Sequence, residues 1–135
     1  MVCLQGASAI EEVLNEFPGK PVHAFVVWEP VLPTDWGAPS TATLNRISDG
    51  RVAQYWDKDR LVSKSMGERD KKSIVWDHIA VYGPGATWDQ KTALFADGPV
   101  IKVLEPARQA IIKALSVKSP PLNCNVAKPA LCETQ

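Results

Sequence analysis

The residue whose type and position are best suited to chemistry is Cys3, at the edge of a segment with a helical apolar stripe. If a helix begins there, its unpaired main-chain N–H groups and its dipole favour the thiolate, the nucleophile of thiol–disulfide exchange. A dithiol site needs a second cysteine about three residues away, and that position falls before Met1. A capping box of Ser8 and Glu11 would start the helix later and leave Cys3 in a loop. Cys3 is then either a reactive thiol or an incidental residue.

Tryptophans and aspartates gather where strands are predicted to end. Such tryptophans would line an aromatic pocket, although large aromatic side chains more often fill a core or seal loops. A part-buried aspartate beside a tryptophan can carry a proton near a thiol, whereas Asp57 would more simply cap a helix. The predicted substrate-binding residues are Trp28, Pro30, Asp35, Trp36, Trp76 and Asp77, of which Trp28 and Trp76 are also expected to be largely buried.

Other chemistries have little support. No cysteine or histidine lies at metal-ligand spacing from His23 or His78, so we expect no metal and no cofactor. Phosphate-binding, dinucleotide-binding and serine-hydrolase motifs are absent from the sequence. Cys124 and Cys132 are interpreted as free thiols.

Composition narrows the class of protein. A chain of 135 residues suits one domain. Its 15 basic and 15 acidic residues balance, and neither sign forms a run long enough to follow a phosphate backbone, so we expect no nucleic-acid partner. The apolar runs are too short to span a membrane, which predicts no membrane partner. No leader follows Met1, so the chain as written is expected in the cytoplasm, and in the periplasm or exported if its true start lies upstream.

The periodicity of apolar residues predicts alternating helices and strands. The continuous apolar run at 22–28 is typical of a strand covered on both faces. We expect strands 22–28 and 74–82 to be neighbours in one sheet, with helices 9–17 and 100–115 packed on it. The remaining predicted elements are a helix at 39–48, a strand at 51–56, a helix from 57 or 58 to 66, and a strand at 93–96 that returns antiparallel to 73–82.

Four sequence motifs, in order, resemble a group of bacterial thioredoxin-like proteins of poorly defined function. They are CLQGA at 3–7, VVWEPVLPTD at 26–35, RVAQYWD at 51–57, and WD at 76–77 followed by YGPG at 82–85 and Trp88. The resemblance covers residues 3–115. It implies an α/β fold, a thioredoxin-like three-layer α/β/α sandwich with a mixed central sheet that lacks the first strand, in a domain at 1–115 followed by an irregular tail at 116–135.

The same resemblance implies a function. Cys3 is similar to the second, resolving cysteine of a C-x-x-C motif, so one hypothesis is a thiol–disulfide oxidoreductase acting on a protein thiol or disulfide. The chain departs from the family pattern in having no proline just ahead of Ile74. The alternative hypothesis is a redox-inactive module that binds a protein or small molecule through its tryptophan-bearing loops. A missing first strand would also expose a sheet edge and favour a homodimer.

Overall fold

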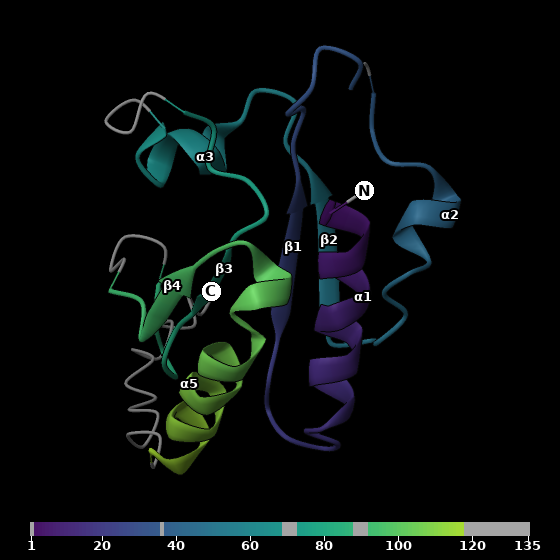
Figure 1. Ribbon diagram of the computed structural model, residues 1–135. Coiled ribbons are helices and arrows are strands. Elements are labelled where there is room, and N and C mark those ends of the chain that lie inside the picture. The colour runs from purple at the N-terminus through teal and green to yellow at the C-terminus, as the bar shows by residue number, and fades with distance from the viewer. Residues whose placement is uncertain (1, 36, 69–72, 88–91, 118–135) are drawn as a thin grey trace, which may run out of the picture.

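The computed structural model describes residues 2–35, 37–68, 73–87 and 92–117, which form an α/β structure (Figure 1). Helices and short strands alternate along most of the chain, as the apolar periodicity predicts. The elements are α1 (Val2–Asn15), β1 (Ala24–Trp28), α2 (Thr41–Leu44), β2 (Val52–Trp56), α3 (Leu61–Ser65), β3 (Ile79–Val81), β4 (Phe95–Asp97), the 3-10 helix η1 (Val100–Lys102) and α5 (Leu104–Ser116).

Helix α1 begins earlier than the apolar stripe alone predicts. It starts at Val2, so the main chain of Cys3 lies in its first turn. The hydroxyl of Ser8 donates to the carbonyl of Leu4 within the helix at 3.2 Å, so the alternative start at a Ser8 capping box is wrong. The stripe buries Val13 and Leu14, and the helix ends before Pro18.

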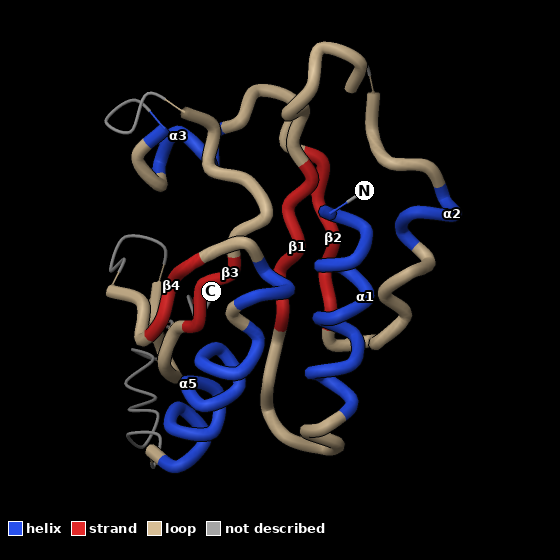
Figure 2. Tube along the Cα trace, in the orientation of Figure 1, coloured by secondary structure: helices blue, strands red, loops and turns tan. Residues whose placement is uncertain are grey.

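The strands form two separate two-stranded sheets, which Figure 2 draws in red. β1 pairs with β2 in parallel, with Ala24 opposite Val52 and Trp28 opposite Trp56. β3 pairs with β4 antiparallel, which confirms the predicted returning strand. The prediction that strands 22–28 and 74–82 are neighbours in one sheet is therefore wrong.

The backbone of Asp77 accounts for the short third strand. Its φ of 49° is in the left-handed region, which breaks the extended conformation predicted over 73–82. Only Ile79–Val81 remains as a strand, and its ladder partner is β4. The parallel and antiparallel pairings of a mixed sheet are both present, but they occur in different sheets.

Helices α1 and α5 contact each other, and α5 packs on β3 and β4, as predicted for the closing helix. The core between them is built largely from small residues. The buried apolar side chains of the described chain are Ala7, Ala9, Val13, Leu14, Ile47, Val100, Ala107, Ala110 and Ala114. Buried alanines thus take the place of larger apolar side chains in much of this core.

One face of the β1–β2 pair carries exposed aromatic residues. Phe25 is 71% exposed and Tyr55 is 54% exposed, and their rings stack with centroids 6.4 Å apart. The expectation that β1 is covered on both faces is wrong. A third layer is accordingly not found over these rings within the described parts of the chain.

The two short middle helices are shorter than predicted. Helix α2 lies within the predicted range of 39–48 and begins after Ser40, whose hydroxyl accepts the N–H of Thr43 at 3.3 Å. Helix α3 begins at Leu61 rather than at 57 or 58, because the chain first turns through Arg60 at a φ of 52°. Of the predicted tail, residues 118–135 lie outside the described residues.

Candidate functional site

Two carboxylates lie at the carboxyl ends of the parallel strands. Glu29 follows β1 and Asp57 follows β2, so both reach the same edge of the sheet. The Asp57 carboxylate accepts the main-chain N–H of Val62 at 2.8 Å, and the Glu29 carboxylate accepts that of Ser63 at 3.0 Å. Both acids therefore bind the otherwise unpaired N–H groups of the first turn of α3.

Ser63 continues this network towards the third strand. It is 1% exposed, and its hydroxyl oxygen accepts the main-chain N–H of Val75 at 2.9 Å. Val75 directly precedes Trp76 and Asp77, two of the predicted site residues. The network thus holds α3 and the chain ahead of β3 in a fixed relation to the ends of β1 and β2.

The carboxylates of this network differ in their affinity for a proton. Burial raises the pKa of Glu29, and the negative charges of Asp57 and Glu68 raise it further. The hydrogen bond from the N–H of Ser63 acts in the opposite direction and lowers it. Hydrogen bonds from Ser63 and Arg60 lower the pKa of Glu68, which also forms an ion pair with Arg60 at 3.1 Å. Because these groups are engaged in capping and ion pairing, we assign the network a positioning role.

Asp77 lies against the second turn of α1. A Cβ added to Gly6 would lie 3.1 Å from Asp77 Oδ1, and one added to Gly98 would lie 2.5 Å from the carbonyl oxygen of Asp77. That carbonyl also accepts the N–H of Val100 at 3.1 Å. Two glycines therefore make room for this left-handed residue between α1 and the start of η1.

The carboxylate of Asp77 is incompletely satisfied. Its Oδ2 atom is buried and has no hydrogen-bond partner in the part of the chain that the structure describes. Gly6 lies about one helical turn after Cys3 along the main chain of α1. The fold therefore brings the Asp77 carboxylate against the main chain of α1, one turn after Cys3.

The other predicted site residues lie elsewhere. Trp28 is half-buried at the end of β1, and its indole N–H donates to the Gln54 side chain at 3.0 Å. Asp35 is exposed and accepts the main-chain N–H groups of Val31 and Leu32 at 2.9 and 2.7 Å, which shapes the loop that also contains Pro30. This turn-forming role was not anticipated.

Trp76 does not have the buried position predicted for it. It is 50% exposed, because it lies in the irregular chain ahead of β3 rather than within a strand. Trp36 lies outside the described residues. Of the predicted binding residues, only Asp77 is thus shown in contact with α1, and no hydrogen bond among the described residues joins it to the loop of Pro30 and Asp35.

An open groove of about 440 Å³ runs along α1 beside the first turns. Its lining is evenly divided between polar and apolar residues, with Glu12 and Arg46 as the charged groups. The lining residues are Leu4, Gln5, Ser8, Ala9, Glu12, Arg46, Ile101 and Leu104. Its first lining residue, Leu4, directly follows Cys3 in the sequence.

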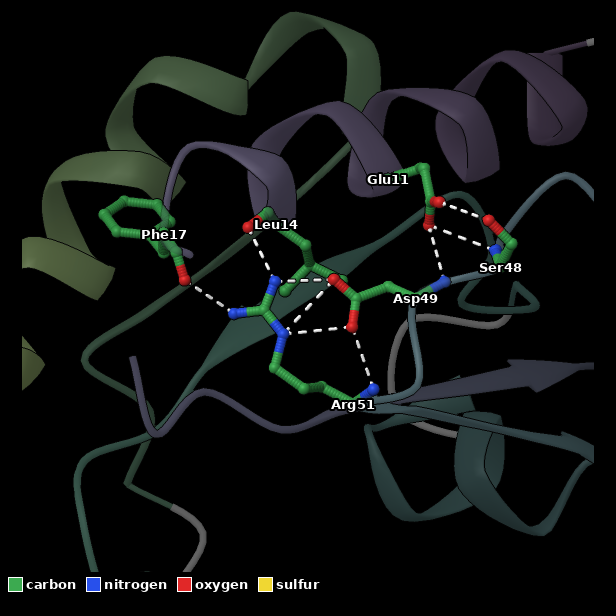
Figure 3. Close-up of polar contacts among 6 residues, drawn as sticks. All are labelled: Glu11, Leu14, Phe17, Ser48, Asp49 and Arg51. Atoms are coloured by element: carbon green, nitrogen blue, oxygen red, sulfur yellow. Dashed lines mark hydrogen bonds and ion pairs between the residues drawn. The ribbon is translucent and has the colours of Figure 1, made fainter. Parts of the chain in front are cut away.

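A second polar network was missed by the sequence analysis (Figure 3). Arg51 donates to the carbonyls of Leu14 and Phe17 at 2.7 and 2.6 Å, and its guanidinium also binds Asp49. Glu11 accepts the main-chain N–H groups of Ser48 and Asp49, both at 3.2 Å, and the hydroxyl of Ser48 at 2.8 Å. These contacts hold the end of α1 against the start of β2.

Local sequence patterns could have indicated the network of Glu29 and Asp57, but not the network of Arg51. Glu29 and Asp57 each follow a predicted strand directly, which is a usable signal for carboxylates at a sheet edge. The partners of Arg51 in α1 and just after it are more than thirty residues away, at separations of 37 and 34. Only the folded chain brings them together.

Comparisons with known proteins give no relative: no family model, no curated protein and no solved structure matches the chain. Across the described ranges, no helix is long and apolar enough to cross a membrane. Within the same ranges, no group of three or more histidine, cysteine, aspartate or glutamate side chains is arranged to hold a metal ion.

Proposed function

We propose that this chain is a thioredoxin-like thiol–disulfide exchange module in which Cys3 supplies the reacting thiol. The observation that carries the proposal is the position of Cys3 in the first turn of α1, one turn ahead of Gly6, against which the buried carboxylate of Asp77 lies. A helix N-terminus favours a thiolate, and a neighbouring carboxylate can take up a proton.

The exchange step needs only a thiol and a disulfide. The Cys3 thiolate attacks one sulfur of a disulfide, forming a new S–S bond while the old S–S bond breaks. The displaced sulfur leaves as a thiolate and takes up a proton. In the resolving role that the family resemblance implies, the disulfide attacked is the one between another cysteine and the substrate, and the reduced substrate is released.

The test is disulfide exchange with oxidised glutathione, followed by intact mass. We expect the wild-type chain to gain one glutathione rapidly, and Cys3→Ser to lose that rapid addition. Cys124→Ser and Cys132→Ser are the matched controls, and each is expected to retain it. Equal rates at all three cysteines would contradict the proposal, as would an unchanged rate in Cys3→Ser.

A redox-inactive binding module is the second candidate, and the exposure of Trp76 favours it. A tryptophan that is 50% exposed offers a contact surface to a partner protein or small molecule. Under this alternative, Cys3→Ser has no effect on partner capture, whereas Trp76→Ala weakens it. If the chain acts by thiol exchange, Cys3→Ser weakens partner capture and Trp76→Ala has no effect on it.

A further inference from the structure

The groove along α1 has two different walls. Figure 1 shows α1 between the chain around α2 and the start of α5, and both sides contribute residues to the groove. Arg46 follows α2 and provides the charged wall, whereas Ile101 and Leu104 provide an apolar wall from η1 and α5. Ile101 is 46% exposed, so the apolar wall offers contact surface to a ligand.

Arg46 differs from the other arginines in the described part of the chain. Arg51, Arg60 and Arg108 each form an ion pair with a carboxylate, and Arg46 forms none there. Its guanidinium has one hydrogen bond, to Ser8 Oγ at 3.5 Å. A guanidinium has five N–H donors in a planar fork that matches a carboxylate, so most of this fork is available to an acidic ligand.

Glu12 places the opposite charge one turn further along α1. Within the described ranges, its side chain forms no ion pair and no hydrogen bond. A second acidic group on a ligand would be repelled there, whereas a basic group would be attracted. The groove therefore favours a ligand whose acid lies near Arg46 and whose base lies near Glu12.

The spacing of the lining residues along α1 matches that of an extended chain. Leu4, Ser8 and Glu12 are four residues apart, which separates them by about 6 Å per step at about 1.5 Å per residue. Side chains on one face of an extended segment recur every second residue, at about 6.6 Å. An apolar, an acidic and a basic side chain at alternate positions would thus reach Leu4, Arg46 beside Ser8, and Glu12.

We propose that this groove binds an extended segment of a partner protein that has an apolar, an acidic and a basic residue at alternate positions. The carboxylate binds Arg46, the base pairs with Glu12, and the apolar side chain packs against Leu4 and the wall of Ile101. The amide side chain of Gln5, which also lines the groove, can donate to and accept from the main chain of the segment.

A passing chain suits the groove better than the other classes of ligand. Small-molecule sites enclose most of the ligand surface, whereas this groove is open and leaves one side of its ligand in water. A second copy docked about a two-fold axis would set one hollow against the same hollow, with no ridge to fill either. The proposal uses no cysteine, so Cys3→Ser is expected to bind the segment as the wild type does.

Two peptides of identical composition test the charge order. The probe is fluorescein-GLSESKG-amide, and its control is fluorescein-GLSKSEG-amide, in which the acid and the base exchange places. In fluorescence anisotropy at low salt, we expect the control to bind the wild-type chain about tenfold more weakly, because it meets a like charge at both positions. Equal affinities would overturn the proposal, as would the absence of binding by either peptide up to about 1 mM.

A charge exchange in the protein tests the same pairing from the other side. Arg46→Glu combined with Glu12→Arg keeps the net charge and changes two exposed side chains. We expect this double variant to prefer the control peptide over the probe. Lys58→Glu combined with Asp59→Lys is the matched exchange outside the groove, and should keep the wild-type preference. An unchanged preference in the first variant would contradict the proposal.

The apolar wall is tested by a matched pair of isoleucines. Ile101 lines the groove and is 46% exposed, whereas Ile112 is 43% exposed and lies outside the groove. Ile101→Ser should weaken binding of the probe by about fivefold to tenfold, and Ile112→Ser should leave it unchanged. Equal effects of the two substitutions would show that the peptide does not lie in this groove.

Discussion

Glu29 and Asp57 bind successive N–H groups of one short helix, although they follow different strands. Asp57 accepts from Val62 and Glu29 accepts from Ser63, so α3 is attached to both strand ends at once. Burial raises the pKa of Glu29 in the folded chain. The protonated acid is therefore favoured by folding, and its ionisation opposes folding.

This arrangement predicts a pH-dependent effect of Glu29→Gln. Because the folded pKa is raised, the contribution of Glu29 is full below its ordinary pKa and is lost as the pH rises through the raised value. At pH 7, Gln keeps an acceptor for Ser63 without the buried charge, so we expect a gain of less than about 1 kcal/mol, discounted for partial exposure.

Urea unfolding at pH 4 and pH 7 measures this effect. The variant and the wild type should agree more closely at pH 4, where the carboxyl is largely protonated. Asp57→Asn is the matched variant, because asparagine also keeps an acceptor for the N–H of Val62. A Glu29→Gln variant that is less stable than the wild type at pH 7 would contradict the burial argument.

Asp49 is expected to show the opposite pH behaviour. Hydrogen bonds from Arg51 lower its pKa from 3.8 to about 2. Its contribution to stability is therefore present above its ordinary pKa and is lost as the pH falls from about 4 towards 2. Asp49→Asn should flatten the acid limb of a plot of melting temperature against pH. Arg46→Ala, which removes an exposed arginine bonded to Ser8 at 3.5 Å, should leave that limb unchanged.

Gly98→Ala is expected to destabilise the fold by about 1–3 kcal/mol, the usual cost of overpacking. Its new Cβ would lie 2.5 Å from the main-chain oxygen of Asp77, which cannot move aside as a flexible side chain could. Gly50→Ala is the control, because no atom lies within 4 Å of its added Cβ. Thermal unfolding of both variants measures the difference, and equal melting temperatures would rule out a close approach at Gly98.

Replacement of Trp28 and replacement of Trp76 should differ in their effect on the free energy of unfolding. Trp76→Ala is expected to cost less than about 1 kcal/mol, because half of the residue is already in solvent. Trp28→Ala removes a half-buried ring and its bond to Gln54, with an expected cost of about 2–4 kcal/mol. Chemical denaturation compares the two, and a larger loss at Trp76 would reverse this assignment.

The sequence predicted local elements better than their assembly. The stripe of α1, the strands at 24–28 and 52–56, and the β3–β4 return all follow from the spacing of apolar residues. The break at Asp77 does not, because its left-handed backbone depends on contacts with Gly6 and Gly98, which are distant in sequence. Without that break, residues 73–82 look like one continuous strand.

For the candidate site, the sequence likewise indicated single residues but not the long-range contacts between them. Cys3 and Asp77 were identified by residue type, and the fold places Asp77 against the helix that contains Cys3. The roles of Glu29 and Ser63 emerge only from hydrogen bonds that span 34 and 12 residues. Apolar periodicity contains no information about such bonds.

The alanine-rich contact between α1 and α5 affects how the chain can tolerate mutation. Alanines such as Ala7, Ala107 and Ala114 have almost no side chain left to remove, so truncation there leaves little empty volume. Enlargement has a different effect, because these alanines are almost fully enclosed and a longer side chain finds no open solvent beside it. Substitution in this region is therefore asymmetric: smaller residues are tolerated sterically, whereas any larger residue must displace the elements packed around it.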